Sequence, residues 1–253
     1  MDTPATIDVD SDPRVTGEHV QQVSNGHATV TLVGVVHDHP ASVYRVRHVI
    51  RDVDPAVLAL ELPPISLTLF EQYAAVDRTP PALGGEMSAA IQAADADVIV
   101  GIDRPTGGFF RRLGRTLLRD RPPVETVRNV VSSAVETTKH ALLCGAAAVV
   151  GARTPVRLDV ASPTPHGVAW TDSPADQARH EREEVRRCRS FMNAFRTASR
   201  SRASRLEDAA REAEMADRLT ELGGDGSEDD DIVAVVGIDH VDSLVDRLDE
   251  TDE

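Results

Sequence analysis

Two segments of the sequence share a short pattern, a glycine three residues before a histidine. The first is Gly34-Val35-Val36-His37, and the second is Gly237-Ile238-Asp239-His240. Each follows an uncharged run rich in β-branched residues, which is typical of a strand buried on both faces. The carboxyl ends of parallel strands open on one side of a sheet, so we expect both histidines to face one crevice. A neutral imidazole there can bind a metal ion or act as a general base, although a core or loop histidine is the structural alternative.

Two glutamates accompany these histidines. Glu61 lies in the apolar run VLALEL at residues 57–62, where a buried carboxylate must be paired or bound to a metal. Its alternative is a strand-end side chain already in water. Glu86 begins a helical stripe that follows two glycines, and the positive end of a helix favours its charge. A simple first-turn helix charge would explain Glu86 as well.

Asp103 and Arg104 follow another predicted strand, at residues 95–103, and should fall on the same edge of the sheet. A guanidinium there could bind a substrate carboxylate or stabilise an oxyanion, and an aspartate could assist a metal ion or a histidine. The structural alternative is an exposed turn.

The elements that must position these residues alternate between strand and helix, which predicts an α/β fold with a mainly parallel central sheet covered by helices. A long charged segment in the C-terminal half carries widely spaced apolar residues and predicts one or two amphipathic helices. The predicted strands are 28–36, 57–62, 95–103 and 232–236, and the predicted helices are 40–53, 87–94, 124–143 (one or two), 175–222 (one or two) and a short one after 240.

The amino-acid composition argues against nucleic acid as a ligand. The chain has 42 acidic and 27 basic residues and a net charge of −15, so most of its surface would repel a nucleic acid. Lys139 is its one lysine, and such an acidic, arginine-rich composition is typical of salt-adapted haloarchaeal proteins. Cys144 and Cys188 lack the spacing of a zinc ribbon or a disulfide framework, and we expect both to be small core residues.

Residues 1–26 are polar and acidic, which predicts a disordered arm, and the remaining residues, 27–253, form one predicted domain. Residues 105–175 show no clear pattern and could be a lid or a helical insertion. The arm lacks the features of a signal peptide, and the longest apolar run, 141–152, is too short to span a bilayer. These features predict a cytoplasmic protein without a transmembrane segment.

In the order of its motifs the chain resembles the TraB/PrgY/GumN family, which is related to the Tiki proteases and more remotely to erythromycin esterase and ChaN-like proteins. The resemblance covers the first hundred residues and the last forty, and leaves the middle unmatched. The matching segments are GVVHDHPASVYRVRHVIRDVDPAVLALEL (34–62), GGEMSAAIQAADADVIVGIDR (84–104), REAEMADRL (211–219) and IVAVVGIDH (232–240).

The resemblance implies a metal-dependent hydrolase with a peptide bond as the favoured target. It implies that His37, His240 and Glu61 bind a divalent metal ion, Mn²⁺, Co²⁺ or Zn²⁺, which would activate water. A peptide or a small molecule is then the expected substrate, and a homo-oligomer stays open.

The remaining roles follow from the same resemblance. Glu61 or Glu86 would be the catalytic carboxylate, Arg104 would be catalytic and substrate-binding, and Arg211 would bind substrate. Two features depart from the family: no arginine follows Glu61 closely, and Arg211 is followed by Glu212.

Two other interpretations remain. A non-catalytic regulator that binds a peptide or signal in the same crevice, as in the pheromone-shutdown members, is favoured by the missing arginine. An amidohydrolase barrel would use His37 and His39 as an HxH pair, with His166 and Asp239 as later ligands. It needs eight strand–helix units, and Pro40 after His39 favours a turn into a helix instead.

Overall fold

The computed structural model describes residues 12–25, 28–76, 78–154, 158, 160, 163–196, 202–225 and 231–250, with side chains left out at a few of these. A five-stranded sheet has the order β1-β2-β5-β3-β4. The strands are β1 (Val20–Asn25), β2 (Ala28–Val35), β3 (Val57–Leu60), β4 (Val98–Gly101) and β5 (Ile232–Gly237). The helices are α1 (Pro40–Val53), α2 (Leu67–Ala74), α3 (Gly85–Ala93), α4 (Gly107–Asp120), α5 (Val124–Arg153), α6 (Pro174–Arg196), α7 (Arg202–Asp225) and α8 (Ile238–Asp249), with a 3₁₀ turn at Pro64–Ser66.

The sheet is parallel except at one edge, where β1 pairs antiparallel with β2. The C-terminal strand β5 inserts between β2 and β3, so the first and last predicted strands are direct neighbours. In this register Val35 lies opposite Gly237, and Leu60 lies opposite Val235. The residues that follow these strands therefore meet at one edge, as the sequence predicted.

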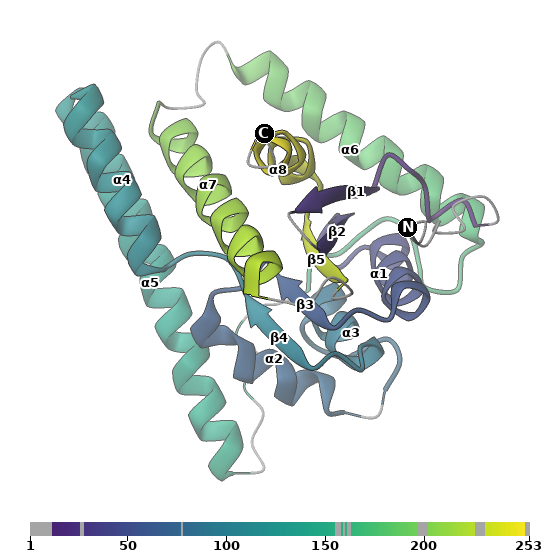
Figure 1. Cartoon of the computed structure of the whole chain (residues 1–253). Helices are drawn as coiled ribbons and strands as arrows, with labels where there is room; N and C mark the ends of the chain where they lie inside the picture. The colour runs from purple at the N-terminus through teal and green to yellow at the C-terminus, as the bar shows by residue number, and fades with distance from the viewer. Residues whose placement is uncertain are drawn as a thin grey trace.

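Helices cover both faces of the sheet (Figure 1). Helices α7 and α8 pack on one face, where Met215 and Leu244 meet sheet residues such as Ala234. On the other face α1 and α3 pack through Val46 and Met87. Alternation along β5 explains the two layers, because successive side chains of a strand point to opposite faces. The predicted α/β class, with its mainly parallel sheet and long C-terminal helices, is confirmed.

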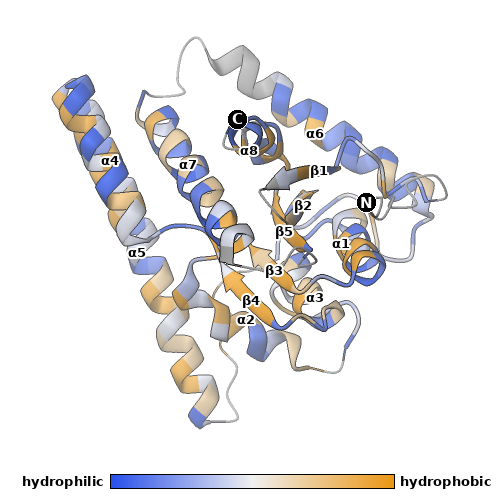
Figure 2. Cartoon of the chain, viewed as in Figure 1, coloured by the Kyte–Doolittle hydropathy of each residue, from blue (hydrophilic) through white to orange (hydrophobic). Residues whose placement is uncertain are grey.

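The outer helices carry both hydrophilic and hydrophobic residues along their length (Figure 2). Helix α5 is a single 30-residue helix, longer than the predicted 124–143, and takes up the apolar run 141–152. Several apolar side chains of α5, Leu142 and Leu143 among them, stay more than half exposed. No helix in the described part of the chain is long and apolar enough to cross a membrane. The cytoplasmic location and the homo-oligomer stay predictions.

Three sequence expectations need correction. Residues 20–25 belong to β1 and not to a disordered arm, because Val20 and Val23 are buried against the sheet. Cys188 is exposed on α6, whereas Cys144 is a core residue as expected. A five-stranded open sheet in the described residues also excludes the eight-stranded barrel of the amidohydrolase interpretation. Residues 1–11, and most of 155–162, lie outside the described residues.

Candidate active site at the carboxyl edge of the sheet

Two cavities meet at the carboxyl edge of the sheet. The first has a volume of about 250 Å³ and is lined by His37, Glu61, Arg211 and His240, among others. The second, of about 190 Å³, shares His37 and Glu61 and continues past apolar side chains of α2 and α3, such as Phe70. The structure therefore brings both predicted histidines and the predicted strand-end glutamate to one cleft.

His37 and Glu86 form a dyad. The Nδ1 atom of His37 lies 2.7 Å from Glu86 Oε1, and the second oxygen of Glu86 accepts the backbone N–H of Asp38 at 2.8 Å. Glu86 is 3% exposed and sits in the first turn of α3, whose positive end stabilises its charge. With Nδ1–H donated to the carboxylate, Nε2 is left to face the cleft, which is the arrangement of an oriented base.

Two glycines make the dyad possible. Gly84 and Gly85 both have positive φ angles, 79° and 48°, a conformation that other residues adopt at a cost. A Cβ atom on Gly85 would lie 2.2 Å from an oxygen of Asp38. The glycine pair that precedes Glu86 in the sequence therefore lets α3 begin close enough for Glu86 to reach His37.

Arg211 of α7 lies at the centre of the cleft. It binds Asp103 through two hydrogen bonds of 2.6 Å each, from Nε and Nη2. It also donates to Glu61, and through Nη1 to His240 Nε2 at 2.9 Å. Four of its five N–H groups thus have partners, and the second N–H of Nη1 has none among the described residues. Burial lowers the pKa of Arg211, but the bonds to Asp103 and the charge of Glu61 raise it overall, so the guanidinium stays charged.

His240 is held by Glu212, the residue after Arg211 at which the sequence departs from the TraB/PrgY/GumN pattern. Its Nδ1 lies 3.0 Å from Glu212 Oε1, and Glu212 also accepts from the hydroxyl of Ser243 at 2.7 Å. Because Arg211 donates to Nε2, that nitrogen must be an acceptor, and Nδ1 carries the hydrogen. Glu212 is thus a positioning residue for His240.

The carboxylates around the cleft shift both histidines in the same direction. The hydrogen bond with Glu86 raises the pKa of His37 to about 9, although burial opposes it. The His37 side chain is 59% exposed, so water screens these charges. Burial lowers the pKa of His240, but the bond to Glu212 and the charge of Glu61 outweigh it and raise the pKa overall. The Arg211 donor still requires a lone pair on His240, so the arrangement described here is that of the neutral ring.

The predicted metal ligands His37, Glu61 and His240 are not arranged to bind one metal ion in this structure. Both oxygens of Glu61 are already bonded, one to Arg211 and the other to the backbone N–H of Gly237. The Nε2 lone pair of His240 accepts from Arg211 as well. His37, Glu61 and His240 do not form a group whose ligand atoms all lie within 4.8 Å of one another. In this structure the cation that Glu61 and His240 both contact is the guanidinium of Arg211.

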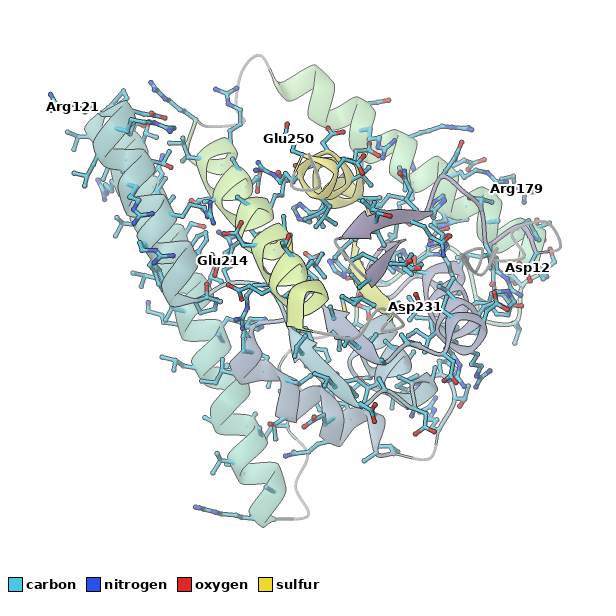
Figure 3. The ribbon with its side chains drawn as sticks, in the orientation of Figure 1. Asp12, Arg121, Arg179, Glu214, Asp231 and Glu250 are labelled. Atoms are coloured by element: carbon cyan, nitrogen blue, oxygen red, sulfur yellow. The ribbon has the colours of Figure 1, made fainter. Side chains whose placement is uncertain are left out.

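Arg104 lines neither cavity of the cleft, and its predicted catalytic and substrate-binding role stays a prediction. Its Nη1 donates to Glu207 Oε2 of α7 at 2.9 Å. Two residues further on, Thr106 donates to Glu214 at 2.6 Å, on the side of α7 that faces α4 (Figure 3). Asp103 therefore accepts from Arg211, whereas Arg104, the next residue, binds Glu207 on another part of α7.

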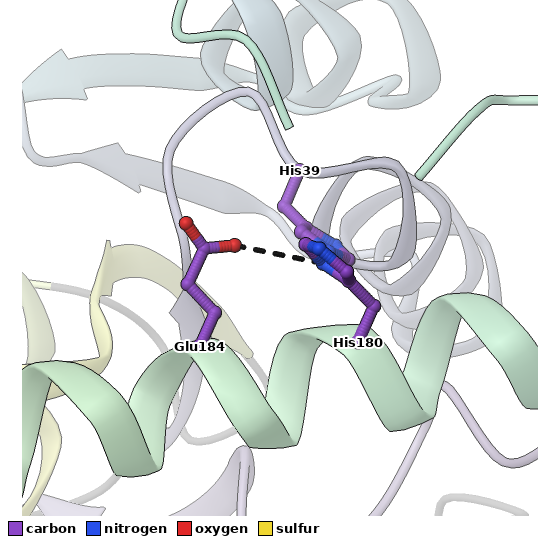
Figure 4. A group of neighbouring side chains, drawn as sticks. All are labelled: His39, His180 and Glu184. Atoms are coloured by element: carbon purple, nitrogen blue, oxygen red, sulfur yellow. Dashed lines mark hydrogen bonds and ion pairs between the residues drawn. The ribbon is translucent and has the colours of Figure 1, made fainter. Parts of the chain in front are cut away.

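A second polar cluster lies beside the cleft, under α6 (Figure 4). His39, His180 and Glu184 each offer a ligand atom, and these atoms all lie within 4.8 Å of one another. The fourth member, His166, donates from Nε2 to the carbonyl of His37 at 2.8 Å, with its Nδ1 3.0 Å from Glu184. The sequence analysis missed His180 and Glu184, although HxxxE spacing in a helix places both on one face and is a signal that could have found them.

In comparisons with known proteins, no family model, no curated protein and no solved structure matches this chain.

Proposed function

We propose that the protein is a hydrolase that cleaves a peptide or ester bond in the cleft between His37 and Arg211. The observation that supports this most is the His37–Glu86 dyad, in which a buried carboxylate orients an imidazole that lines both cavities. The order of the sequence motifs, which resembles the TraB/PrgY/GumN family, agrees with the proposal.

The chemistry needs only side chains of this chain. Neutral His37 takes a proton at Nε2 from a water molecule as the water oxygen bonds to the substrate carbonyl carbon. Glu86 stabilises the imidazolium, and the second Nη1 hydrogen of Arg211, which has no partner in the described part of the chain, can stabilise the oxyanion. When the carbon–nitrogen or carbon–oxygen bond breaks, the leaving atom takes the proton from His37. His240 and Glu61 hold the guanidinium in place.

The shape and charge of the cleft restrict the substrate. The combined volumes of about 250 Å³ and 190 Å³ suit a short segment rather than a folded protein. Phe70, Tyr73 and Met87 line the second cavity, so an apolar side chain fits there. Glu61, Glu86 and other carboxylates line the two cavities, against the guanidinium of Arg211, which disfavours a strongly anionic substrate.

One observation favours a second candidate, a binder without turnover. With a pKa of about 9, His37 is mostly protonated at neutral pH and is then a hydrogen-bond donor, not a base. Such a site would hold a peptide or small signal without cleaving it, in keeping with the pheromone-shutdown interpretation of the sequence.

The test is a turnover screen of short peptides and esters in high salt across about pH 6 to 10, the range that spans the His37 transition. We expect turnover that rises toward pH 9 and falls at least about 100-fold in His37→Gln. His48→Gln is the matched control, because His48 is partly exposed on α1 and stacks only on Tyr44. Binding of substrates with no turnover at any pH would favour the binder, and turnover retained by His37→Gln would refute the mechanism.

A further inference from the structure

We infer that His39, His180 and Glu184 form a binding site for a transition-metal cation of the Zn²⁺ or Co²⁺ type, separate from the proposed catalytic groups. His39 comes from the end of the loop that links β2 to α1, whereas His180 and Glu184 lie one turn apart on α6 (Figure 4). The site would therefore join two elements that are about 140 residues apart in the chain, as the hydrogen bond between the two histidines already does.

Two of the three separations between ligand atoms are close to those around a tetrahedral ion, and the ligand atoms of His39 and Glu184 lie within 4.8 Å of one another. His39 Nε2 lies 3.1 Å from His180 Nδ1, and His180 Nδ1 lies 3.7 Å from a carboxylate oxygen of Glu184. Ligands bound at about 2.0–2.2 Å from a tetrahedral zinc ion are about 3.3–3.6 Å apart, so both separations are within a few tenths of an ångström of that range.

The donor set selects the class of cation. Two imidazoles and one carboxylate suit Zn²⁺, Co²⁺ or Ni²⁺ better than Mg²⁺ or Ca²⁺, which prefer oxygen ligands. His39 is fully buried, and the side chains of His180 and Glu184 are 22% and 26% exposed, which leaves a path for the ion from the α6 side. Three protein ligands would leave a fourth position for water.

The resting hydrogen positions predict how the ion enters. Nδ1 of His39 caps α1 by accepting the backbone N–H of Ala41 at 3.1 Å, so Nε2 carries the hydrogen and donates it to His180. A cation bound at Nε2 takes the place of that hydrogen, which moves to Nδ1 of the neutral ring, so Nδ1 then no longer accepts the backbone N–H of Ala41.

His166 connects this site to the cleft, because it contacts both Glu184 and the backbone of His37. His166 lies 3.0 Å from the oxygen of Glu184 that faces His180, and its other nitrogen donates to the backbone carbonyl of His37. Outer groups of this kind orient metal ligands, and their loss weakens metal affinity by about 10–100-fold. The ion would thus fix α6 and the loop carrying His166 beside His37, without touching the reacting atoms.

The experiment measures Zn²⁺ content by elemental analysis and Co²⁺ binding by visible absorption, on the full chain in high salt. We expect near-stoichiometric binding by the wild type and by His48→Gln. His180→Gln and Glu184→Gln should each lose binding by at least about 100-fold, and His166→Gln by about 10–100-fold. Circular dichroism verifies that each variant is folded. Glu184→Gln keeps the shape of the side chain, so it tests the site even if His180→Gln does not fold.

A His37→Gln, His240→Gln double variant separates this inference from the proposed function. It should keep its metal while losing turnover. Loss of metal in the double variant alone would place the ion in the cleft and overturn the inference. Absence of binding by the wild type, or binding that His180→Gln and Glu184→Gln retain, would overturn it as well, and neither result bears on the His37 mechanism.

Discussion

Replacing Arg211 with methionine should destabilise the fold more than any surface change on the same helix. The guanidinium is 17% exposed, and its two carboxylate partners, Glu61 and Asp103, have side chains that are 4% and 9% exposed. Methionine fills a similar volume but leaves both carboxylates without their cation and His240 without its donor. The protein must then either bury uncompensated charge or draw water into the cleft.

The size of the effect follows from this burial. Removing one partner of a buried ion pair costs about 3–5 kcal/mol, and partial exposure of Arg211 favours the lower end, about 3 kcal/mol. For a chain of this length a loss of 1 kcal/mol lowers Tm by about 2–4 °C, so the variant should melt about 6–12 °C below the wild type. High salt screens exposed pairs and affects this buried one much less.

The assay is urea unfolding followed by circular dichroism, supported by thermal melting. Arg218→Met is the matched control, because Arg218 lies on the same helix, is 43% exposed and, among the described residues, pairs with Glu221 at 3.5 Å. We expect the control to change the free energy of unfolding by less than about 1 kcal/mol. Equal effects of Arg211→Met and Arg218→Met would refute the argument that Arg211 holds the cleft together.

Two further predictions concern charge. Because the pKa of His37 is raised to about 9 from 6.5, its pairing with Glu86 stabilises the fold fully below about pH 6.5 and is lost as pH rises through 9. Glu86→Gln should remove this pH dependence from denaturant unfolding and move the rising limb of the rate profile to lower pH. An unchanged profile would contradict the dyad. Arg45→Met should cost about 3–5 kcal/mol in the same unfolding assay, since the buried Glu181 keeps the hydroxyl of Ser42 but loses its arginine, and a loss below 1 kcal/mol would contradict that view.

The strands that carry the site residues could be predicted from the local sequence. The uncharged runs before His37 and His240 are long enough to indicate buried strands, and parallel strands bring their ends to one edge. Glu61 was singled out because a carboxylate in an apolar run needs a partner. The structure supplies Arg211 as that partner.

The rest depends on contacts between distant segments, which local patterns do not encode. The direction of Arg104 is set by Glu207 on α7, more than a hundred residues away. Helix α6 agrees with the predicted helical segment 175–222, but its inward face is polar: Glu181 meets Arg45 and Ser42, and His180 meets His39. A charged residue in a helix usually faces water, so the charges of this segment alone do not indicate which of them are buried.

The most direct test of the central claim, that His37 activates water in the cleft, is hydrolysis of a substrate from the screen in oxygen-18-labelled water. At about pH 9, near the pKa of His37, we predict that the new carboxyl group carries the label and that the wild type and His48→Gln form it at similar rates. His37→Gln should form it at least about 100-fold more slowly. Products without the label, or labelled product formed by His37→Gln at the wild-type rate, would contradict the account.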